Sequence, residues 1–282
     1  GAASDPVGKF FRTADSAVLF PEYIARSVRQ GMEEGDLLPS ITAATTRFEG
    51  MDYRSITAQA GGDSKELKAV DEGASIPATT IQVQANLVKL RKRGRMLVAS
   101  YEAVRYQKLD LFSVTLRQIG SHIAQMLLAD AVEVLIHGDG NDNAAAASET
   151  KGAGVLTYDE LVDFWAAFDP YEMNTLLVSS DVLLKMLKLA EFQNPLTGLN
   201  FQGTGKLSTP LGATLLRTSV LPKNTAIGLD KRYALELVQG SDVTVEYDKL
   251  IDRQLERAAI TTISGFAKLF QGASRVLTVK AS

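Results

Sequence analysis

The sequence predicts an α+β protein, and three patterns along its 282 residues support that prediction. Apolar residues recur with helical spacing through one long stretch that starts near residue 110. Segments in which apolar and polar residues alternate, as they do in strands, lie on both sides of that stretch. Beyond residue 150, helical and strand patterns alternate without an internal repeat. The chain is long enough to bury a sizeable core.

The first 20 residues are expected to form an arm, because isolated apolar anchors are separated there by Gly, Pro and polar residues. A helix is expected to follow, since Pro21 suits a first helical position. Ile24 and Val28 then lie one turn apart on its apolar side. Gly31 or Gly35 can end this helix, and an extended segment begins shortly afterwards.

The segment from Arg54 to Ser100 contains no Phe, Tyr or Trp, which is the strongest compositional shift in the chain. Its centre is rich in Gly, Ala and charged residues, and its return limb at 81–84 alternates as a strand does. We therefore expect a long two-stranded ribbon with a polar tip. Because an isolated hairpin is only marginally stable in water, the ribbon should lie against something else, such as another subunit.

The strongest helix is expected from Asp110 to about His137, where apolar residues follow the 3.6-residue period. Asp110 is expected to be its N-cap, and Gly138 the residue that ends it. At 1.5 Å per residue, such a helix is roughly 40 Å long. A helix of this length often acts as a beam along which other elements pack.

The region after this helix is expected to mix loops, helices and strands. Residues 138–154 should form a loop, and Thr157 and Glu160 have the spacing of a capping box that opens a helix. A buried strand at 174–178 and a helix capped by Ser180 should follow. The remaining expected elements are a loop at 194–208 and strands at 211–220, 226–229, 243–247, 257–270 and 276–279.

Composition excludes several classes of function. The chain has no Cys, so disulfides, thiolate metal sites and cysteine nucleophiles are excluded. Only His122 and His137 could supply imidazole, which excludes multi-histidine zinc sites. The net charge of −3 and the pI near 5.6 differ from those of a basic nucleic-acid binder. No apolar run reaches the roughly 18 residues of a membrane span, so no membrane partner is expected. Residues 1–6 have neither the basic nor the apolar region of a signal peptide, so none is expected.

Near-matches to catalytic and ligand-binding motifs favour ordinary structural roles. Residues 200–207 resemble a phosphate loop but lack its first Gly and its final Ser or Thr, which favours a surface loop. Residues 139–150 begin like a calcium loop but lack its Gly and its final Glu, which favours a turn that ends a helix. His122 lies in mid-helix, so a Ser-His-Asp triad is poorly supported. We expect no catalytic residue, metal or cofactor.

A dense basic run at 89–95 could bind nucleic acid. Its alternation along a strand would instead divide the charges between two faces, and the ribbon tip is rich in carboxylates. We therefore favour charge pairing between subunits. The residues expected to make these contacts are Asp63, Lys65, Glu66, Lys68, Asp71, Glu72, Arg91 and Arg93.

Two stretches match local sequences of a known family. One is Leu-Ile-His-Gly-Asp-Gly at 135–140, where the long helix ends. The other is Leu-Gly-Ala-Thr-Leu-Leu at 211–216, followed by Leu-Pro-Lys-Asn-Thr-Ala-Ile-Gly-Leu-Asp at 221–230. Their order, together with the arm, ribbon, long helix and closing strands, covers nearly the whole chain. In this arrangement the chain resembles a tailed-bacteriophage major capsid protein of the Hong Kong 97 type.

The resemblance implies an α+β subunit with the Hong Kong 97-type fold in four parts. Residues 1–44 would be an N-terminal arm, and residues 45–98 an E-loop that reaches over a neighbour. Residues 99–150, with the spine helix, and 237–282, with the closing strands, would form a peripheral domain. Residues 151–236 would form an axial domain that meets its copies around five-fold and six-fold axes.

The resemblance also implies a structural role rather than an enzymatic one. Hexamers and pentamers of the chain would form an icosahedral shell around double-stranded DNA, in a virion assembled in the host cytoplasm. Its partners would be a portal and, in some members, a scaffold, a maturation protease or decoration proteins. Such a protease would explain a start at Gly1, whereas a gene product with Met directly before Gly1 would contradict it. Some relatives join an E-loop Lys to a peripheral-domain Asn of a neighbour, but no Asn follows Asn224, so no covalent mesh is expected.

Two other functions remain open from the sequence. The same architecture could form an encapsulin-like compartment that holds cargo enzymes. From a different class, the chain could be a soluble α/β enzyme that uses the near-match to a phosphate loop at 198–207.

Overall fold

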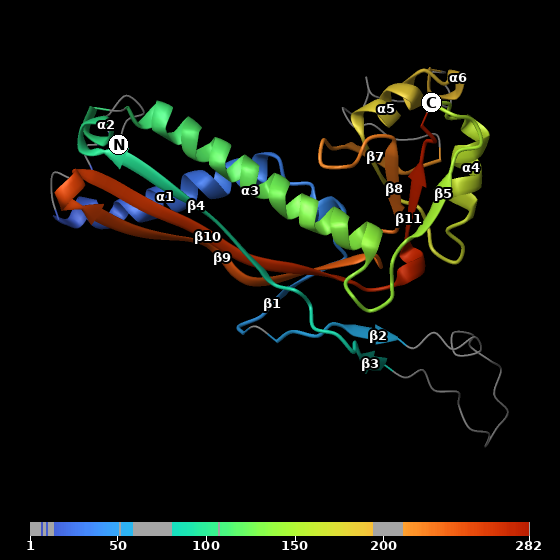
Figure 1. Cartoon of the computed structure of the whole chain (residues 1–282), viewed down its shortest axis with the longest axis horizontal. Helices are drawn as coiled ribbons and strands as arrows, with labels where there is room; N and C mark the ends of the chain where they lie inside the picture. The colour runs from blue at the N-terminus through green and yellow to red at the C-terminus, as the bar shows by residue number, and fades with distance from the viewer. Residues whose placement is uncertain are drawn as a thin grey trace.

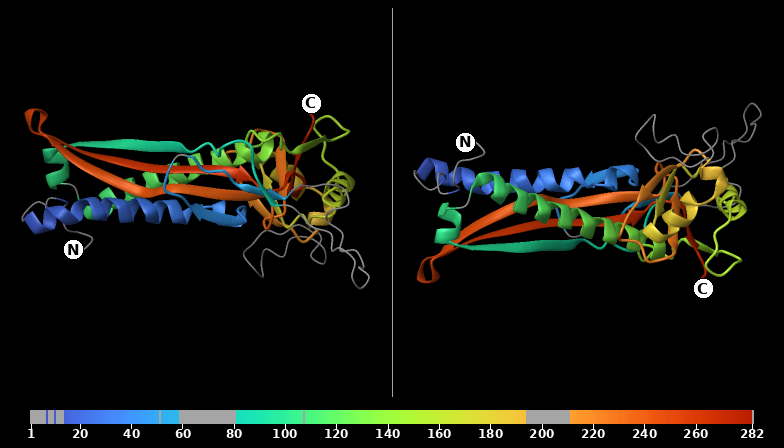
Figure 2. Two further views of the ribbon diagram at one scale, coloured as in Figure 1. Left: turned by 90° about the horizontal axis from the view of Figure 1, so that it is seen from below. Right: turned by 90° about the horizontal axis from the view of Figure 1, so that it is seen from above.

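The structure, a computed structural model, describes residues 7, 10, 14–50, 52–58, 81–106, 108–193 and 211–281. They form an elongated body with a sheet at each end, and a two-stranded ribbon projects from between the two sheets (Figure 1). The longer part is a four-stranded sheet with two long helices along it (Figure 2). The other part is a five-stranded sheet with shorter helices around it. The predicted α+β class is confirmed.

The secondary structure begins with α1 (Ala14–Glu34), η2 (Leu38–Ser40), β1 (Ala44–Arg47), β2 (Ile56–Ala58), β3 (Ile81–Val83), β4 (Arg91–Ser100), α2 (Tyr101–Tyr106) and α3 (Leu109–His137). It continues with β5 (Ala146–Glu149), α4 (Tyr158–Ala166), β6 (Thr175–Val178), α5 (Ser180–Leu187), α6 (Ala190–Gln193), β7 (Thr214–Arg217) and β8 (Thr225–Leu229). It ends with β9 (Leu235–Leu250), η3 (Ile251–Arg253), β10 (Leu255–Lys268), η4 (Gln271–Ala273) and β11 (Ser274–Thr278).

The predicted helix start at Pro21 is wrong, because α1 already begins at Ala14 and contains that proline. A proline inside a helix removes one backbone hydrogen bond. Phe20 and Ile24 flank it and are buried in the core that α1 shares with α3, and this burial holds the helix together across the proline. The helix ends just before Gly35, one of the two glycines predicted to end it.

The other predicted terminator, Gly31, lies inside α1 where that helix meets α3. A Cβ at Gly31 would lie 2.0 Å from the carbonyl oxygen of Arg117 on α3. A Cβ at Gly120 of α3 would lie 2.0 Å from the carbonyl oxygen of Val28 on α1. Because real Cβ atoms do not come this close, the two helices can touch here only through glycine.

The long helix predicted near 110–137 is confirmed as α3, which has 29 residues and ends at Gly138 (φ 81°). Its N-cap is Lys108 and not Asp110, which lies in the first turn. Eighteen consecutive residues of α3 have a mean hydropathy of 1.4, so by length and composition this helix could cross a membrane. Polar residues are spaced along α3, so its high mean hydropathy does not show as an unbroken apolar run in the sequence. However, 56% of those residues are buried, as in a core helix of a globular body.

The four-stranded sheet has the order β1-β9-β10-β4. β9 and β10 contain the predicted strands at 243–247 and 257–270 and form a long antiparallel hairpin, while β1 pairs with β9 in parallel. Buried and partly exposed residues alternate along β10, because one face of the sheet packs against α1 and α3. β4 continues the return limb of the ribbon and pairs with β10 from Arg91 to Ser100.

The five-stranded sheet has the order β5-β11-β8-β6-β7 and its own apolar core with α4 and α5. The capping box of Thr157 and Glu160 is confirmed, whereas Ser179, not Ser180, is the N-cap of α5. β5 was not predicted: it lies in the expected loop at 138–154 and pairs with β11 far along the chain. The predicted loop at 194–208 lies outside the described residues.

Two strands of this sheet come from segments that the expected division groups with the peripheral domain. They are β5, within 99–150, and β11, within 237–282. β6, β7 and β8 come from the expected axial segment 151–236. The division into arm, E-loop, peripheral and axial domains stays a prediction.

Candidate assembly site at the base of the ribbon

The base of the predicted ribbon, here called the ribbon base, consists of residues 52–58 and 81–90. Its strands β2 and β3 are antiparallel, with Ile56 opposite Val83. The ribbon base leaves the body near the end of α3 and extends away from both sheets (Figure 1). The six predicted contact residues of the tip lie outside the described residues: Asp63, Lys65, Glu66, Lys68, Asp71 and Glu72.

One buried carboxylate ties the outgoing limb of the ribbon base to the body. Glu236, at the start of β9, is 5% exposed. Its Oε1 accepts hydrogen bonds from Thr46 Oγ1 at 2.5 Å and from Tyr53 OH at 2.6 Å. Its Oε2 accepts a hydrogen bond from the buried Ser55 hydroxyl. Burial, together with the bond to Glu236, raises the pKa of Tyr53, which keeps the phenol a donor.

The loop after α3 ties down the return limb. Asn141 Oδ1 accepts a hydrogen bond from the backbone N–H of Asn86 at 2.9 Å, and its Nδ2 donates to Gln84 Oε1 at 3.3 Å. Asp139 holds Asn141 in turn: Asp139 Oδ1 accepts hydrogen bonds from the backbone N–H and from the Nδ2 of Asn141. This is the segment that resembles the start of a calcium loop, and it forms the turn that was predicted to end the helix.

A fully buried lysine, Lys268, lies beneath this loop at the end of β10. Its Nζ donates to the carbonyl oxygen of Leu135 in the last turn of α3 at 3.2 Å, and its backbone N–H donates to Asp139 Oδ2 at 2.8 Å. Its carbonyl oxygen accepts from Gln84 Nε2 at 3.1 Å and from Asn143 Nδ2 at 3.4 Å. Burial lowers the pKa of Lys268 to about 8, and the Asp139 carboxylate opposes that shift.

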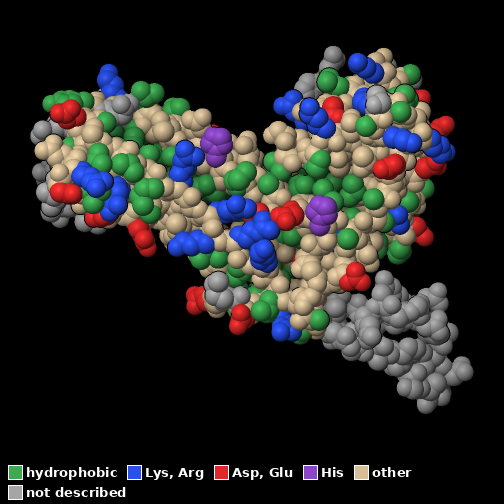
Figure 3. Space-filling model, viewed as in Figure 1, with side chains coloured by type: hydrophobic (Ala, Val, Ile, Leu, Met, Phe, Trp, Pro, Cys, Tyr) green, Lys and Arg blue, Asp and Glu red, His purple; other side chains and the backbone are tan. Residues whose placement is uncertain are grey.

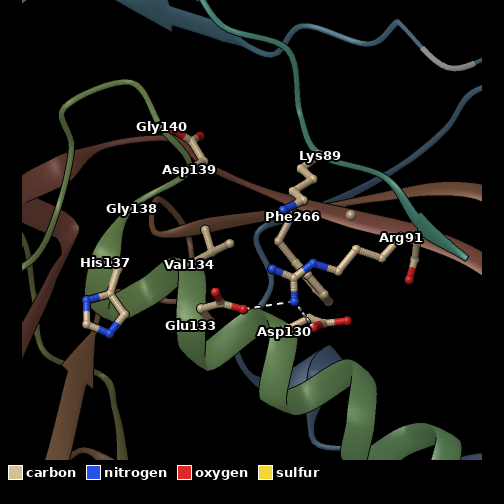
Figure 4. A pocket seen from close by; sticks show the side chains of 12 residues that line it. Lys89, Arg91, Asp130, Glu133, Val134, His137, Gly138, Asp139, Gly140 and Phe266 are labelled. Atoms are coloured by element: carbon tan, nitrogen blue, oxygen red, sulfur yellow. Dashed lines mark hydrogen bonds and ion pairs between the residues drawn. The ribbon is translucent and has the colours of Figure 1, made fainter. Parts of the chain in front are cut away.

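A third connection joins β4 to α3. Arg91 Nη1 lies 2.6 Å from Asp130 Oδ1 and 2.9 Å from Glu133 Oε2 (Figure 4). Arg93 donates to the same aspartate from Nη2 at 2.5 Å and from Nε at 3.2 Å. Asp130 is nearly buried, and both arginines remain about one-third exposed. The hydrogen bond from Arg91 lowers the pKa of Glu133.

The predicted site residues Arg91 and Arg93 are therefore paired within the subunit. The basic run does divide between two faces, since Arg91 and Arg93 face α3 while Lys92 between them is exposed. Their contact with a neighbouring subunit stays a prediction.

A pocket of about 250 Å³ opens between these connections, lined by Lys89, Arg91, Glu133, His137 and Phe266 among others (Figure 4). Positive and negative side chains both line it, and Figure 3 shows the two signs intermingled over this part of the surface. Among the described residues, no group of three or more His, Asp or Glu could hold a metal ion. The pocket is therefore lined by charged side chains of both signs.

The two faces of the ribbon base differ. On one face Ser55, Gln84 and Val88 are buried against the body. On the other, Ile56 is 59% and Val83 61% exposed, and these two residues lie opposite each other on β2 and β3. The ribbon base is therefore held on the face that carries Ser55, Gln84 and Val88, and it presents an apolar pair on its free face.

Sequence reasoning missed the four charged residues that hold this site: Asp130, Asp139, Glu236 and Lys268. A signal was present for three of them, since Asp130, Glu236 and Lys268 each interrupt a run of apolar residues. A charge inside a buried apolar run must find a partner, because burial of an unpaired charge is costly. The sequence does not show which distant segment supplies that partner.

The fold and this site define a shell subunit of the Hong Kong 97 type: a long helix on a four-stranded sheet, a second sheet, and a ribbon anchored at its base. The chain belongs to the phage capsid protein family, whose model matches residues 84–267. It is a structural major capsid protein, which confirms the predicted relationship and role. Among curated proteins, none matches the chain.

Solved capsid structures share the fold. The capsid of the native GTA particle matches with a TM-score of 0.64 and 16% identity, over 86% of this chain and 90% of that chain. A virus-like particle from Pyrococcus furiosus matches with a TM-score of 0.60 and 13% identity, over 92% and 99%. Gordonia phage Cozz matches with a TM-score of 0.60 and 14% identity, over 88% and 87%.

These comparisons bear on the two alternatives. The similarity to the virus-like particle shows the shared fold alone, whereas the family match is to phage capsid proteins, so an encapsulin-like shell is not better supported. The enzyme alternative depended on residues 198–207, which lie outside the described residues. Membership of the capsid family gives the chain a structural role instead.

Proposed function

We propose that copies of this protein assemble into hexamers and pentamers of a closed icosahedral shell that encloses double-stranded DNA, and that the protein catalyses nothing. The observation that carries this proposal is the ribbon base. Three sets of polar contacts fix it to the body, yet it extends away from both sheets with Ile56 and Val83 exposed (Figure 1). A rigidly held projection with an apolar free side suits a contact between copies of the chain.

Charge pairing between subunits is part of this proposal. The acidic residues Asp63, Glu66, Asp71 and Glu72, with Lys65 and Lys68, would meet the basic strand of a neighbour. Arg91 uses only Nη1 in its described ion pairs, and a guanidinium has five N–H donors in all. Arg91 and Arg93 can therefore hold Asp130 within the subunit and still receive a carboxylate of the neighbour at their exposed edge.

The further partners follow from the same proposal. A closed shell that is filled with DNA needs a portal, and a scaffold, a protease or decoration proteins would act during assembly. The shell would be part of a virion that is assembled in the host cytoplasm. With a net charge of −3, the subunit would not bind the packaged DNA tightly.

Electron microscopy of the purified protein tests this function. We expect closed particles of uniform size from the full chain, and folded subunits without particles when residues 61–79 are deleted. The matched control is a deletion of 198–205, in the segment where a phosphate loop was considered, which should leave the ribbon intact. A full chain that stays monomeric at high concentration would contradict the proposal. Global unfolding of the 61–79 deletion would contradict the role given to the ribbon.

A further inference from the structure

The free face of the ribbon base combines an apolar patch with one cation. Side chains alternate between the two faces of a strand, so Arg54 and Ile56 of the outgoing limb both point away from the body, and both are exposed. Val83 and Leu87 of the return limb lie on the same face and are 61% and 42% exposed. Arg54 Nη1 donates a hydrogen bond to the carbonyl oxygen of Ala85 at 2.7 Å, and among the described residues its guanidinium makes no ion pair. The free face therefore presents apolar side chains beside an unpaired positive charge.

The four-stranded sheet has one face without a helix, here called the open face, with Glu246 on β9, Ala259 on β10, and Met96 and Val98 on β4. Ile260 and its alternate neighbours on β10 point into the core with α1 and α3, so the residues between them point to the opposite face. Met96 is 51% and Val98 50% exposed. Ala259 lies directly opposite Met96 on one side and Glu246 on the other, so these three residues form a row across the sheet.

The charge of the open face is opposite to that of the free face. Glu246 is exposed and forms no ion pair within the part of the chain that the structure describes. In the next row of the sheet, Asp248 is already paired with Arg257. The small side chain of Ala259 leaves room between Met96 and Glu246. The open face therefore offers apolar contact on β4 and an unpaired carboxylate on β9, which complements an apolar patch beside an arginine.

The two surfaces of one copy cannot meet each other. β4 begins at Arg91, just after the return limb, and at about 3.3 Å per residue Met96 lies about 17 Å further along the strand. The ribbon base extends away from both sheets instead of folding back along β4 (Figure 1). The partner that fits the free face is therefore the open face of a second copy of the chain.

We propose that the free face of one ribbon base packs on the open face of the next copy, with Arg54 beside Glu246. The inference deepens the proposed function, because it assigns the surface that receives the ribbon. The two surfaces differ, so each copy contacts one neighbour with its ribbon base and another with its open face, and repetition by rotation closes a ring. An exposed ion pair adds little affinity, but it fixes the register of the contact and disfavours like charges.

The absence of cysteine allows this contact to be tested by cross-linking. Chains with Val83→Cys and chains with Met96→Cys are mixed, allowed to assemble and treated with a short bis-maleimide. We expect covalent dimers from the mixture and only traces from either variant alone, because the contact joins two different surfaces. The matched control mixes Val83→Cys with Leu111→Cys, whose position on α3 is 61% exposed but lies off the open face, and it should give only traces of dimer.

Charge reversal tests the ion pair in the same assay. Arg54→Glu, added to the Val83→Cys chain, should lower the yield of dimer several-fold, because it places a carboxylate against Glu246. Glu246→Arg, added to the Met96→Cys chain, should then restore the yield. Loss of the hydrogen bond from Arg54 to Ala85 within the ribbon could not be repaired in this way from another chain. Glu102→Arg, at an exposed position of α2, is the control for the second change and should not restore the yield.

Three outcomes would overturn the proposal. One is an equal yield from the mixture with Met96→Cys and the mixture with Leu111→Cys. Another is a yield that Glu246→Arg does not restore. The third is abundant dimer from Met96→Cys alone, since the open face would then meet its own copy. Closed particles without the expected cross-link would refute this contact and leave the proposed function intact, whereas cross-linked dimers without closed particles would refute the shell and leave the contact.

Discussion

The contact between α1 and α3 predicts a large effect from one added methyl group. In Gly120→Ala, the new Cβ would lie 2.0 Å from the carbonyl oxygen of Val28 and 2.8 Å from the backbone nitrogen of Met32. Side-chain carbons hardly ever come within about 3 Å of another heavy atom, so the two helices must separate by roughly 1 Å. Both of these atoms belong to the α1 backbone and cannot turn aside as a side chain could.

The expected loss of stability follows from two opposing terms. Overpacking of a well-packed core costs about 1–3 kcal/mol, and a clash with backbone belongs at the upper end of that range. Alanine in place of glycine inside a helix returns about 1 kcal/mol. The net loss is therefore about 2 kcal/mol, which lowers the melting temperature of a chain of this size by roughly 3–4 °C.

Thermal unfolding of the unassembled subunit, followed by circular dichroism, measures this loss. The matched control is Gly35→Ala, at the end of α1, where the nearest atom to an added Cβ is Ser121 Oγ at 3.9 Å. We expect that control to change the melting temperature little. If Gly120→Ala and Gly35→Ala have the same melting temperature, the close approach of α1 and α3 through glycine is refuted.

Three further predictions concern the ribbon, the junction between the sheets and the assembled particle. Glu236→Leu leaves the hydroxyl groups of Ser55 and Tyr53 without their acceptor. Trypsin should therefore cut after Arg54 much faster in this variant than in the control Glu236→Gln, which keeps an acceptor. Equal cleavage rates in the two variants would contradict the role of Glu236 as an anchor. Burial raises the pKa of Asp230, but hydrogen bonds from Arg232, Glu172 and Asn174 outweigh it and lower the pKa to about 2. The stability from this carboxylate is therefore present above its ordinary pKa of 3.8 and is lost as the pH falls through about 2. Arg232 is 55% exposed, so solvent screening reduces the contribution of this carboxylate to the free energy of unfolding to about 1–2 kcal/mol. In urea unfolding, the unsubstituted chain should lose this stability between pH 4 and pH 2, and Asp230→Asn should not. Denaturing gels of assembled particles should show a single band at 30.4 kDa, because no Asn follows Asn224 to join Lys65 or Lys68; a ladder of multimers would contradict this.

The parts of the fold that the sequence predicted are those that local patterns determine. The 3.6-residue period of α3 and the capping box of α4 each lie within one stretch of chain, and both are found where expected. β5 was missed because its strand character comes from pairing with β11, more than 120 residues away. The start of α1 was misplaced because the rule for proline is local, whereas the burial of Phe20 and Ile24 depends on α3.

The candidate site shows the same limit more sharply. The ribbon was predicted from its composition, and its base is found as an antiparallel pair. Arg91 and Arg93 were noted as a basic run, but their partner Asp130 lies on α3, nearly 40 residues further along. Which charges meet is decided by how the sheet and the helix pack together.

The use of buried charges at this site, beside the apolar cluster of Val88, Val238 and Ala267, has a physical reason. Glu236, Asp130 and Lys268 each lie in an apolar stretch, and each holds a different part of the segment from Thr46 to Arg93. Apolar contact is non-directional, so a ribbon held by it alone could slide or turn at little cost. A buried charge instead loses several kcal/mol of solvation unless its hydrogen bonds are made at the correct angle and distance. Each of the three charges therefore penalises every ribbon direction but one, and a shell made of many identical contacts requires that single direction in every copy.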